Sequence, residues 1–178
     1  MIVAGLDLSL TSTGVAMVNP EGAHFTDRIK SKDQAGASLG QRQDRLRGIA
    51  DNVIATVTGS DLIVIEGPSY ASKFGHPHDR SGLWWMVVSR LMHAGLDVID
   101  VAPSARAKYA TGAGNAGKDA VLAAAVKRYP EWDITGNDVA DAVILAAMGC
   151  RHLGHPIDSL PQIHLTAMTK VRWPETKE

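Results

Sequence analysis

One stretch of the sequence constrains the fold more than any other. Residues 62–65 (Leu-Ile-Val-Ile) are continuously apolar, lie between Asp61 and Glu66, and are followed at once by Gly67-Pro68. A strand without polar alternation is typical of the centre of a parallel sheet that helices cover on both faces. The glycine and the proline end the strand. The stretch therefore predicts an α/β protein with a buried central strand.

The segments around this strand follow the order of a mixed sheet. Two short apolar runs, Ile2 to Leu6 and Gly14 to Val18, precede it, and the turn residues 19–22 lead into a third strand around residues 23–29, which completes an antiparallel meander. The helical period recurs from Ser38 to Thr58. Further along we expect helices over about 80–94, 104–110, 118–129 and 137–150, with Asn137 as the N-cap of the last, and a second buried strand over 96–101.

Length and composition limit how the chain is organised. With 178 residues, 45% of them hydrophobic, and a net charge of −1, the chain fits one compact soluble domain. We place this domain at residues 1–151, followed by a proline-punctuated extension over 152–178. The single cysteine, Cys150, excludes an intramolecular disulfide and a cysteine-based zinc site. Neither a signal peptide nor a membrane span is expected, so the predicted location is the cytoplasm.

Four acidic residues stand where a purely structural role is hard to justify. Asp7 and Glu66 each end an apolar strand, and ligands bind at the carboxyl ends of strands in open α/β sheets. Asp138 and Asp141 are three residues apart at the start of a helix and therefore share one face. If the two strands are parallel neighbours, their carboxylates emerge at one end of the sheet.

Clustered carboxylates repel one another, and near neutral pH they are tolerated mainly when cations neutralise them. All-oxygen ligands favour Mg²⁺ or Mn²⁺ over softer metals. Two such ions can clamp a scissile phosphate and activate the attacking water. The four acids therefore predict phosphodiester hydrolysis.

Each acid taken alone has a plainer explanation. Asp138 is favoured by the positive end of a helix dipole, and Asp7 is a suitable turn residue at the end of a strand. Glu66 has less use in a tight turn, because the apolar residues before it place it near the core. The combination of the four carries the prediction.

The motifs around these acids resemble the RuvC-like Holliday junction resolvases of the ribonuclease H-like superfamily. Five motifs occur in register over residues 1–151: Gly5-Leu6-Asp7 with Thr13-Gly14-Val15-Ala16, Ile65-Glu66-Gly67-Pro68, Val101-Ala102-Pro103-Ser104, Gly117-Lys118, and Asn137-Asp138-Val139-Ala140-Asp141-Ala142. The resemblance implies a five-stranded sheet in the order 3-2-1-4-5, a homodimer with two active sites, and Mg²⁺-dependent paired nicking of a four-way junction. It also implies a bacterial or bacteriophage origin. Asp7, Glu66, Asp138 and Asp141 match the metal-binding acids of the family, with two ions per site.

The resemblance implies further site residues, and it departs from the family at one loop. Family members often have Pro-Gly after the first aspartate, where this chain has Leu8-Ser9. Lys118 matches a lysine near the metal site that orients a phosphate or stabilises developing charge. Tyr70 and Phe74 are candidates for the aromatic residue that stacks at the junction, or they only pack their loop.

DNA binding by a chain without a basic excess requires a local positive surface. Arg106 and Lys108 follow the last strand and are candidates for contacts with the DNA backbone, together with Lys118. Lys73 and Arg80 extend the predicted rim in the loop after Glu66. The alternative for each is an ordinary solvated charge.

Three other functions share features with a junction resolvase. Asp7 with Ser9 to Gly14 also looks like the first phosphate loop of actin-like ATPases and sugar kinases, but 178 residues leave no room for their second lobe. We therefore expect no nucleotide cofactor. A structural protein that binds branched DNA without cutting has no need for acids that face phosphates. A nuclease with a broader preference for flaps or forks stays open.

Overall fold

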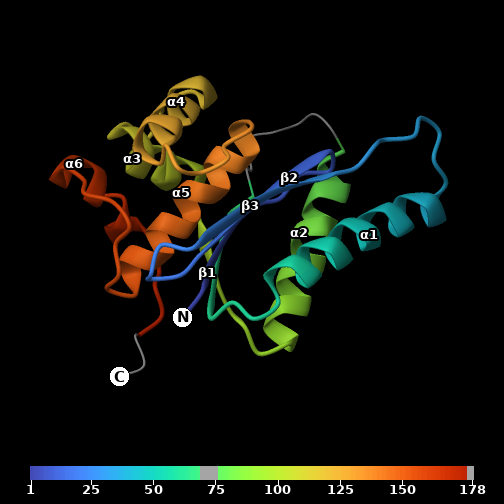
Figure 1. The fold of residues 1–178 in the computed structure, drawn as a ribbon. Helices are drawn as coiled ribbons and strands as arrows, with labels where there is room; N and C mark the ends of the chain where they lie inside the picture. The colour runs from blue at the N-terminus through green and yellow to red at the C-terminus, as the bar shows by residue number, and fades with distance from the viewer. Residues whose placement is uncertain (69–75, 176–178) are drawn as a thin grey trace.

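The computed structural model describes residues 1–68 and 76–175, which form a five-stranded mixed sheet with helices on both faces (Figure 1). The spatial order of the strands is β3-β2-β1-β4-β5, as the family resemblance implied. The first three pair antiparallel, and β1, β4 and β5 run parallel. Their bounds are β1 Val3–Asp7, β2 Ser12–Val18, β3 His24–Lys30, β4 Leu62–Glu66 and β5 Asp97–Val101.

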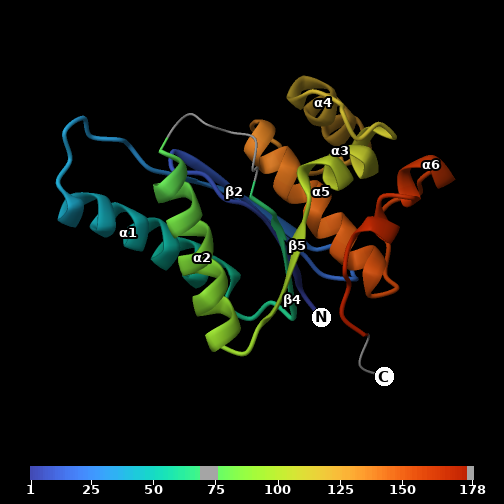
Figure 2. The ribbon, with the colours of Figure 1, turned by 180° about the vertical axis from the view of Figure 1, so that it is seen from behind.

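The helices form two layers around this sheet, as Figures 1 and 2 show from opposite sides. Helices α1 (Leu39–Val57) and α2 (Pro77–His93) cover one face. Helices α3 (Pro103–Thr111), α4 (Lys118–Arg128) and α5 (Asn137–His152) lie on the other, followed by α6 (Gln162–Leu165) and a 3₁₀ turn, η1 (Met168–Lys170). Each face has its own apolar cluster, because alternate residues of the central strands point to opposite sides.

Glycines allow α5 to lie directly on the middle of the sheet. A Cβ on Gly5 of β1 would stand 2.0 Å from the carbonyl oxygen of Ala142, and one on Gly14 of β2 would stand 2.0 Å from that of Asp138. Gly149 of α5 is also close to strand side chains, with Val3 Cγ1 2.6 Å from its ideal Cβ position. Helix α5, which contains two of the four acids, thus contacts the sheet at positions where any residue larger than glycine would force the backbone to shift.

Several predicted elements differ from the structure in detail. Strand β5 was expected to be buried, but it lies at the edge of the sheet and pairs only with β4, so most of its residues are partly exposed. The N-cap of α5 is Gly136, and Asn137 is the first helical residue, so the N-cap predicted at Asn137 was wrong. Helix α2 begins at Pro77, earlier than expected, since proline suits the first turn of a helix.

The described part of the C-terminal segment packs on the layer formed by α3 to α5. Ala167 is fully buried, and Asp158 accepts hydrogen bonds from the hydroxyls of Tyr109 and Tyr129. Arg151 at the end of α5 pairs with the same carboxylate. This buried network fixes the segment to the domain. Over residues 1–68 and 76–175, no helix is long and apolar enough to cross a membrane.

Candidate active site

Two of the four acids meet at the ends of adjacent parallel strands. Leu6 of β1 is in register with Ile65 of β4, so Asp7 and Glu66 are the next residues on neighbouring strands. Along each strand, Gly5 and Val64 face α5, whereas Leu6 and Ile65 pack in the cluster under α1 and α2. By this alternation Asp7 and Glu66 project to the α5 side of the sheet. The predicted convergence of these two carboxylates is therefore present.

The first two turns of α5 bring the other two acids to the same end of the sheet. Asp141 is 3% exposed and packs beneath α3. Asp138 is one turn earlier and accepts hydrogen bonds from the hydroxyl of Ser12 on β2 and from Nη2 of Arg28 on β3 at 3.2 Å. Each oxygen of the Asp138 carboxylate thus has a separate partner.

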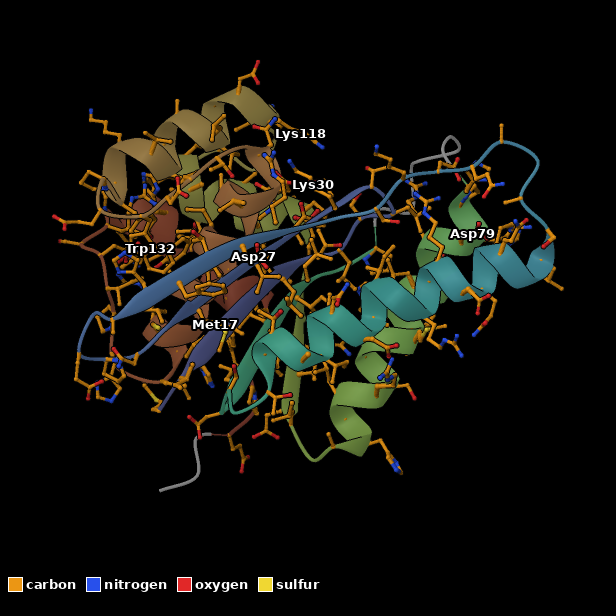
Figure 3. All side chains as sticks on the ribbon, turned by 45° about the vertical axis from the view of Figure 1, so that its right-hand side comes forward. Met17, Asp27, Lys30, Asp79, Lys118 and Trp132 are labelled. Carbon is orange, nitrogen blue, oxygen red and sulfur yellow. The ribbon has the colours of Figure 1, made fainter. Side chains whose placement is uncertain are left out.

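Strand β3 also holds the loop that leads into α5. Alternate side chains of the strand, His24, Thr26 and Arg28, reach the carbonyl oxygens of Glu131, Asp133 and Thr135 at 3.1, 3.0 and 2.9 Å. The ring of His24 stacks on Trp132 of that loop, with 4.6 Å between centroids; Figure 3 labels Trp132 beside the sheet. These contacts fix the entry into α5 and hence the position of Asp138.

Arg106 bridges two acids from the opposite side. It follows the start of α3, and its guanidinium donates from Nε to Glu66 and from Nη1 to Asp141. The residue is 6% exposed. We expected Arg106 at the surface as a contact to the DNA backbone; the structure instead buries it among the carboxylates, because the end of β5 directs α3 across the strand ends.

Burial and mutual repulsion favour protonation of these acids. The pKa of Asp7 is raised well above its ordinary value, first by burial and then by the charges of Glu66 and Asp141. Burial raises the pKa of Asp141 to about 7, although the charges of Arg106 and Lys118 oppose the shift. Such a site holds its full negative charge only when further cations enter it.

The donor set fits a hard divalent cation. All four candidate ligands are carboxylates, which Mg²⁺ and Mn²⁺ prefer, and three of the acids are linked by contacts or charge effects within one cluster. Among residues 1–68 and 76–175, no group of three histidine, cysteine or carboxylate side chains is arranged so that it could hold a metal ion. Instead, Arg106 engages Glu66 and Asp141, and Arg28 engages Asp138.

The other predicted site residues are distributed around this cluster. Lys118 is the first residue of α4, is exposed, and acts electrostatically on Asp7 and Asp141 (Figure 3). Lys108 is half-buried in the last turn of α3, and Arg80 is half-buried in the first turn of α2. Tyr70, Lys73 and Phe74 lie outside the described residues.

Sequence reasoning missed Arg28 and Ser12. Arg28 lies in a strand with mixed polarity, and Ser12 lies in a polar stretch, so neither pattern marks a site. Both reach Asp138 across more than a hundred residues of chain. Ser12 and Arg28 could have been identified only from the sheet order, which places β2 and β3 beside the start of α5.

A curated relative covers nearly the whole chain. The crossover junction endodeoxyribonuclease RuvC of Sphingopyxis alaskensis is 28% identical over 159 residues, which are 85% of this chain and 98% of the relative. No family model matches the chain. The similarity therefore extends over most of both chains.

Solved structures show the same fold. The Thermus thermophilus RuvC structure matches with a TM-score of 0.68 at 18% identity and covers 87% of this chain and 98% of its own. T. thermophilus RuvC in complex with a Holliday junction substrate matches with a TM-score of 0.62 at 20% identity, over 82% of this chain and 90% of that one. The five-stranded sheet and its flanking helices are thus common to these proteins.

Proposed function

We propose that this chain, which is RuvC-like in sequence and in fold, is an endodeoxyribonuclease that resolves four-way DNA junctions. The observation that carries the proposal is the cluster of Asp7, Glu66, Asp138 and Asp141 at one end of the sheet. A curated relative that is named for this activity and a fold-mate solved with a Holliday junction support it. The nuclease domain would span residues 1–151, with residues 152–178 as an extension.

Divalent cations are part of this proposal. Asp7, Glu66, Asp138 and Asp141 are the residues that would hold two Mg²⁺ ions, with Mn²⁺ as a substitute. The chemistry that the ions would supply is activation of the attacking water and neutralisation of charge on the scissile phosphate. No covalent enzyme intermediate is part of this proposal, since a metal-activated water would be the nucleophile.

The surrounding residues would position the acids and the phosphate. Ser12 and Arg28 hold the Asp138 carboxylate by one oxygen each, so its orientation is fixed before substrate arrives. Lys118 is exposed at the rim and within electrostatic reach of the acids. Its ammonium can bind a phosphate oxygen and stabilise the charge that develops during cleavage. Lys108 and Arg80 are further candidates for contacts with the DNA backbone.

Paired nicking requires two active sites, and α2 offers a surface for dimer formation. Trp85 and Met92, seven residues apart, are 64% and 54% exposed on one side of this helix. Ser89, between them on the same side, is small. An exposed tryptophan and methionine one heptad apart are typical of a helix face that packs against a second protein surface. We therefore propose a homodimer that contacts through α2.

Two alternatives predict different substrate ranges. A nuclease of the same fold with broader specificity would cut flaps and forks as well as junctions. A structural protein would bind junctions without cutting them. The four acids disfavour such a protein, because negative charge beside phosphates opposes DNA binding unless metal ions are also held there.

A substrate panel tests the proposal. A labelled four-way junction is compared with a matched linear duplex, a flap and a fork, each with Mg²⁺, Mn²⁺ or EDTA. We expect symmetrical nicks confined to the junction in the presence of either metal, and none in EDTA. Comparable cutting of all branched forms would support the broader nuclease, and binding without cutting under every condition would support the structural protein.

A further inference from the structure

We propose that Arg106 is the cation that the carboxylate cluster holds when no divalent ion is bound, and that its guanidinium leaves Glu66 and Asp141 when metal enters. The inference rests on the proposed metal-dependent function and adds a regulatory residue to the same site. It assigns Arg106 a role in controlling metal loading instead of in contacting the DNA surface.

The contacts of Arg106 support this role. One guanidinium serves both acids, donating from Nε to Glu66 on β4 and from Nη1 to Asp141 on α5. The side chains of all three residues are largely buried, with 8%, 17% and 5% of their surfaces exposed for Arg106, Glu66 and Asp141. The positive charge therefore lies between carboxylates from two elements, which is the place that a ligated cation would take.

The buried carboxylates need neutralisation at this position. A buried carboxylate is neutralised either by a proton or by a nearby cation, and the guanidinium of Arg106 is the cation that contacts Glu66 and Asp141. Arg106 supplies that charge from within the chain. A divalent ion that binds the same oxygens must therefore compete with a guanidinium that is already hydrogen-bonded to them.

The structure distinguishes Arg106 from the second arginine at the site. Arg28 contacts only Asp138 among the acids, at 3.2 Å, and is also bonded to the carbonyl oxygen of Thr135. Together with Ser12, which donates to the other oxygen, Arg28 keeps the Asp138 carboxylate oriented. Arg106 engages two acids at once, and the described contacts include no backbone carbonyl that holds it in place. Its long side chain can therefore move away without a shift of α3.

Metal binding to variants of the full chain tests the inference. Calorimetric titration with Mg²⁺ compares wild type, Arg106→Gln and Arg106→Lys. Removal of the competing charge should raise the affinity of Arg106→Gln for Mg²⁺ at least tenfold, and Arg106→Lys, which cannot donate to both acids from fixed positions, should lie between the two. The control is Arg151→Gln, which breaks another buried arginine–aspartate pair outside the site and should leave Mg²⁺ affinity unchanged.

A second measurement uses the unaltered protein, in case Arg106→Gln does not fold. The Nε–H of Arg106 is buried and hydrogen-bonded, so its ¹⁵N-resolved resonance should be protected from exchange with water in the metal-free protein. Addition of Mg²⁺ should shift this resonance and remove the protection.

The outcomes distinguish a failure of the role of Arg106 from a failure of the proposed metal-dependent function. Equal or weaker Mg²⁺ binding by Arg106→Gln, or an Arg106 resonance that Mg²⁺ does not change, would overturn the role of Arg106 while leaving metal-dependent cleavage intact. Absence of divalent-ion binding in wild type and in every variant would instead overturn the proposed function, and the inference with it.

Discussion

At the residue scale, the acids and the basic residues of the site have separable tasks. Asp141 is buried, the other three acids are half-buried, and all four would hold metal ions, whereas Lys118 is exposed at the rim. Removing a carboxylate therefore takes away negative charge without removing a contact to phosphate. This separation lets cleavage and binding be measured independently.

Single replacements of the acids should abolish cutting and spare binding. We expect Asp7→Asn, Glu66→Gln and Asp141→Asn each to lower the rate of junction cleavage by more than about a hundredfold, because a metal ligand is lost. Affinity for the junction in a gel-shift assay should be unchanged or higher. Parallel loss of binding and cutting would show that these acids support the fold instead of the chemistry.

Lys118 should affect the chemical step more than DNA affinity. Lys118→Ala is expected to slow single-turnover cleavage about a hundredfold, because it removes a charge beside the reacting phosphate, while the dissociation constant changes only a few-fold. Lys127→Ala, in the last turn of the same helix, is the matched control and should alter neither quantity. Equal losses of rate and affinity for Lys118→Ala would make the residue an ordinary phosphate contact.

The sequence identified these candidates with unequal success. Glu66 could be recognised because it directly follows an apolar run, and Asp138 and Asp141 because their spacing places them on one helix face. The structure brings Asp7, Glu66 and Asp141 into one cluster, while their roles stay proposals. Arg28 and the buried position of Arg106 could not be foreseen, since both depend on contacts between elements that are distant in sequence.

At the level of secondary structure, the packing of α5 against the sheet determines where Asp138 and Asp141 lie. Gly5→Ala would place a Cβ 2.0 Å from the carbonyl oxygen of Ala142 and push the helix outward. We expect a loss of about 1–3 kcal/mol in the free energy of unfolding, together with slower cleavage, because Asp138 and Asp141 move with α5.

A glycine on another helix provides the control for this variant. Gly48 of α1 is exposed, and a Cβ at this position meets no atom within 4 Å. Gly48→Ala should stabilise the protein by about 0.5–1 kcal/mol and leave cleavage unchanged. Denaturant unfolding measures both variants; a Gly5→Ala protein as stable as wild type would contradict the close seating of α5.

The boundaries of helices and strands could be predicted where the sequence contains a local capping or turn motif. Ser38 caps α1 through reciprocal bonds with Gln41, a pattern readable in sequence, and α1 begins next to the predicted position. The exposure of β5 had no such signal, because an edge strand and a central strand can have similar apolar residues. Its position at the edge depends on which strand pairs with it, a property of the whole sheet.

At the level of the whole molecule, the proposed dimer depends on the exposed surface of α2. Trp85→Asp would replace the largest exposed apolar side chain of the α2 surface by a charge, and we expect the variant to sediment as a monomer. Leu39→Asp, at a 78% exposed position on α1, is the control and should not change the oligomeric state. Identical sedimentation of wild type and Trp85→Asp would place the dimer contact elsewhere or exclude it.

The overall architecture was predictable because two kinds of information agreed. The apolar run at residues 62–65 required a covered parallel strand, and five motifs in register implied the strand order that the structure confirms. The packing of residues 153–175 was not apparent, since the buried bonds of Asp158 with Tyr109 and Tyr129 join parts of the chain that show no common pattern.

The proposed function requires the molecule to cut both strands of a junction by a metal-dependent reaction. The most direct measurement follows a supercoiled plasmid with an extruded cruciform, incubated with the wild-type protein and Mg²⁺, beside Glu66→Gln and EDTA controls. We expect linear plasmid, produced by two nicks within one binding event, with wild type and Mg²⁺ only. Intact plasmid in all three reactions, or equal cutting by Glu66→Gln, would contradict it.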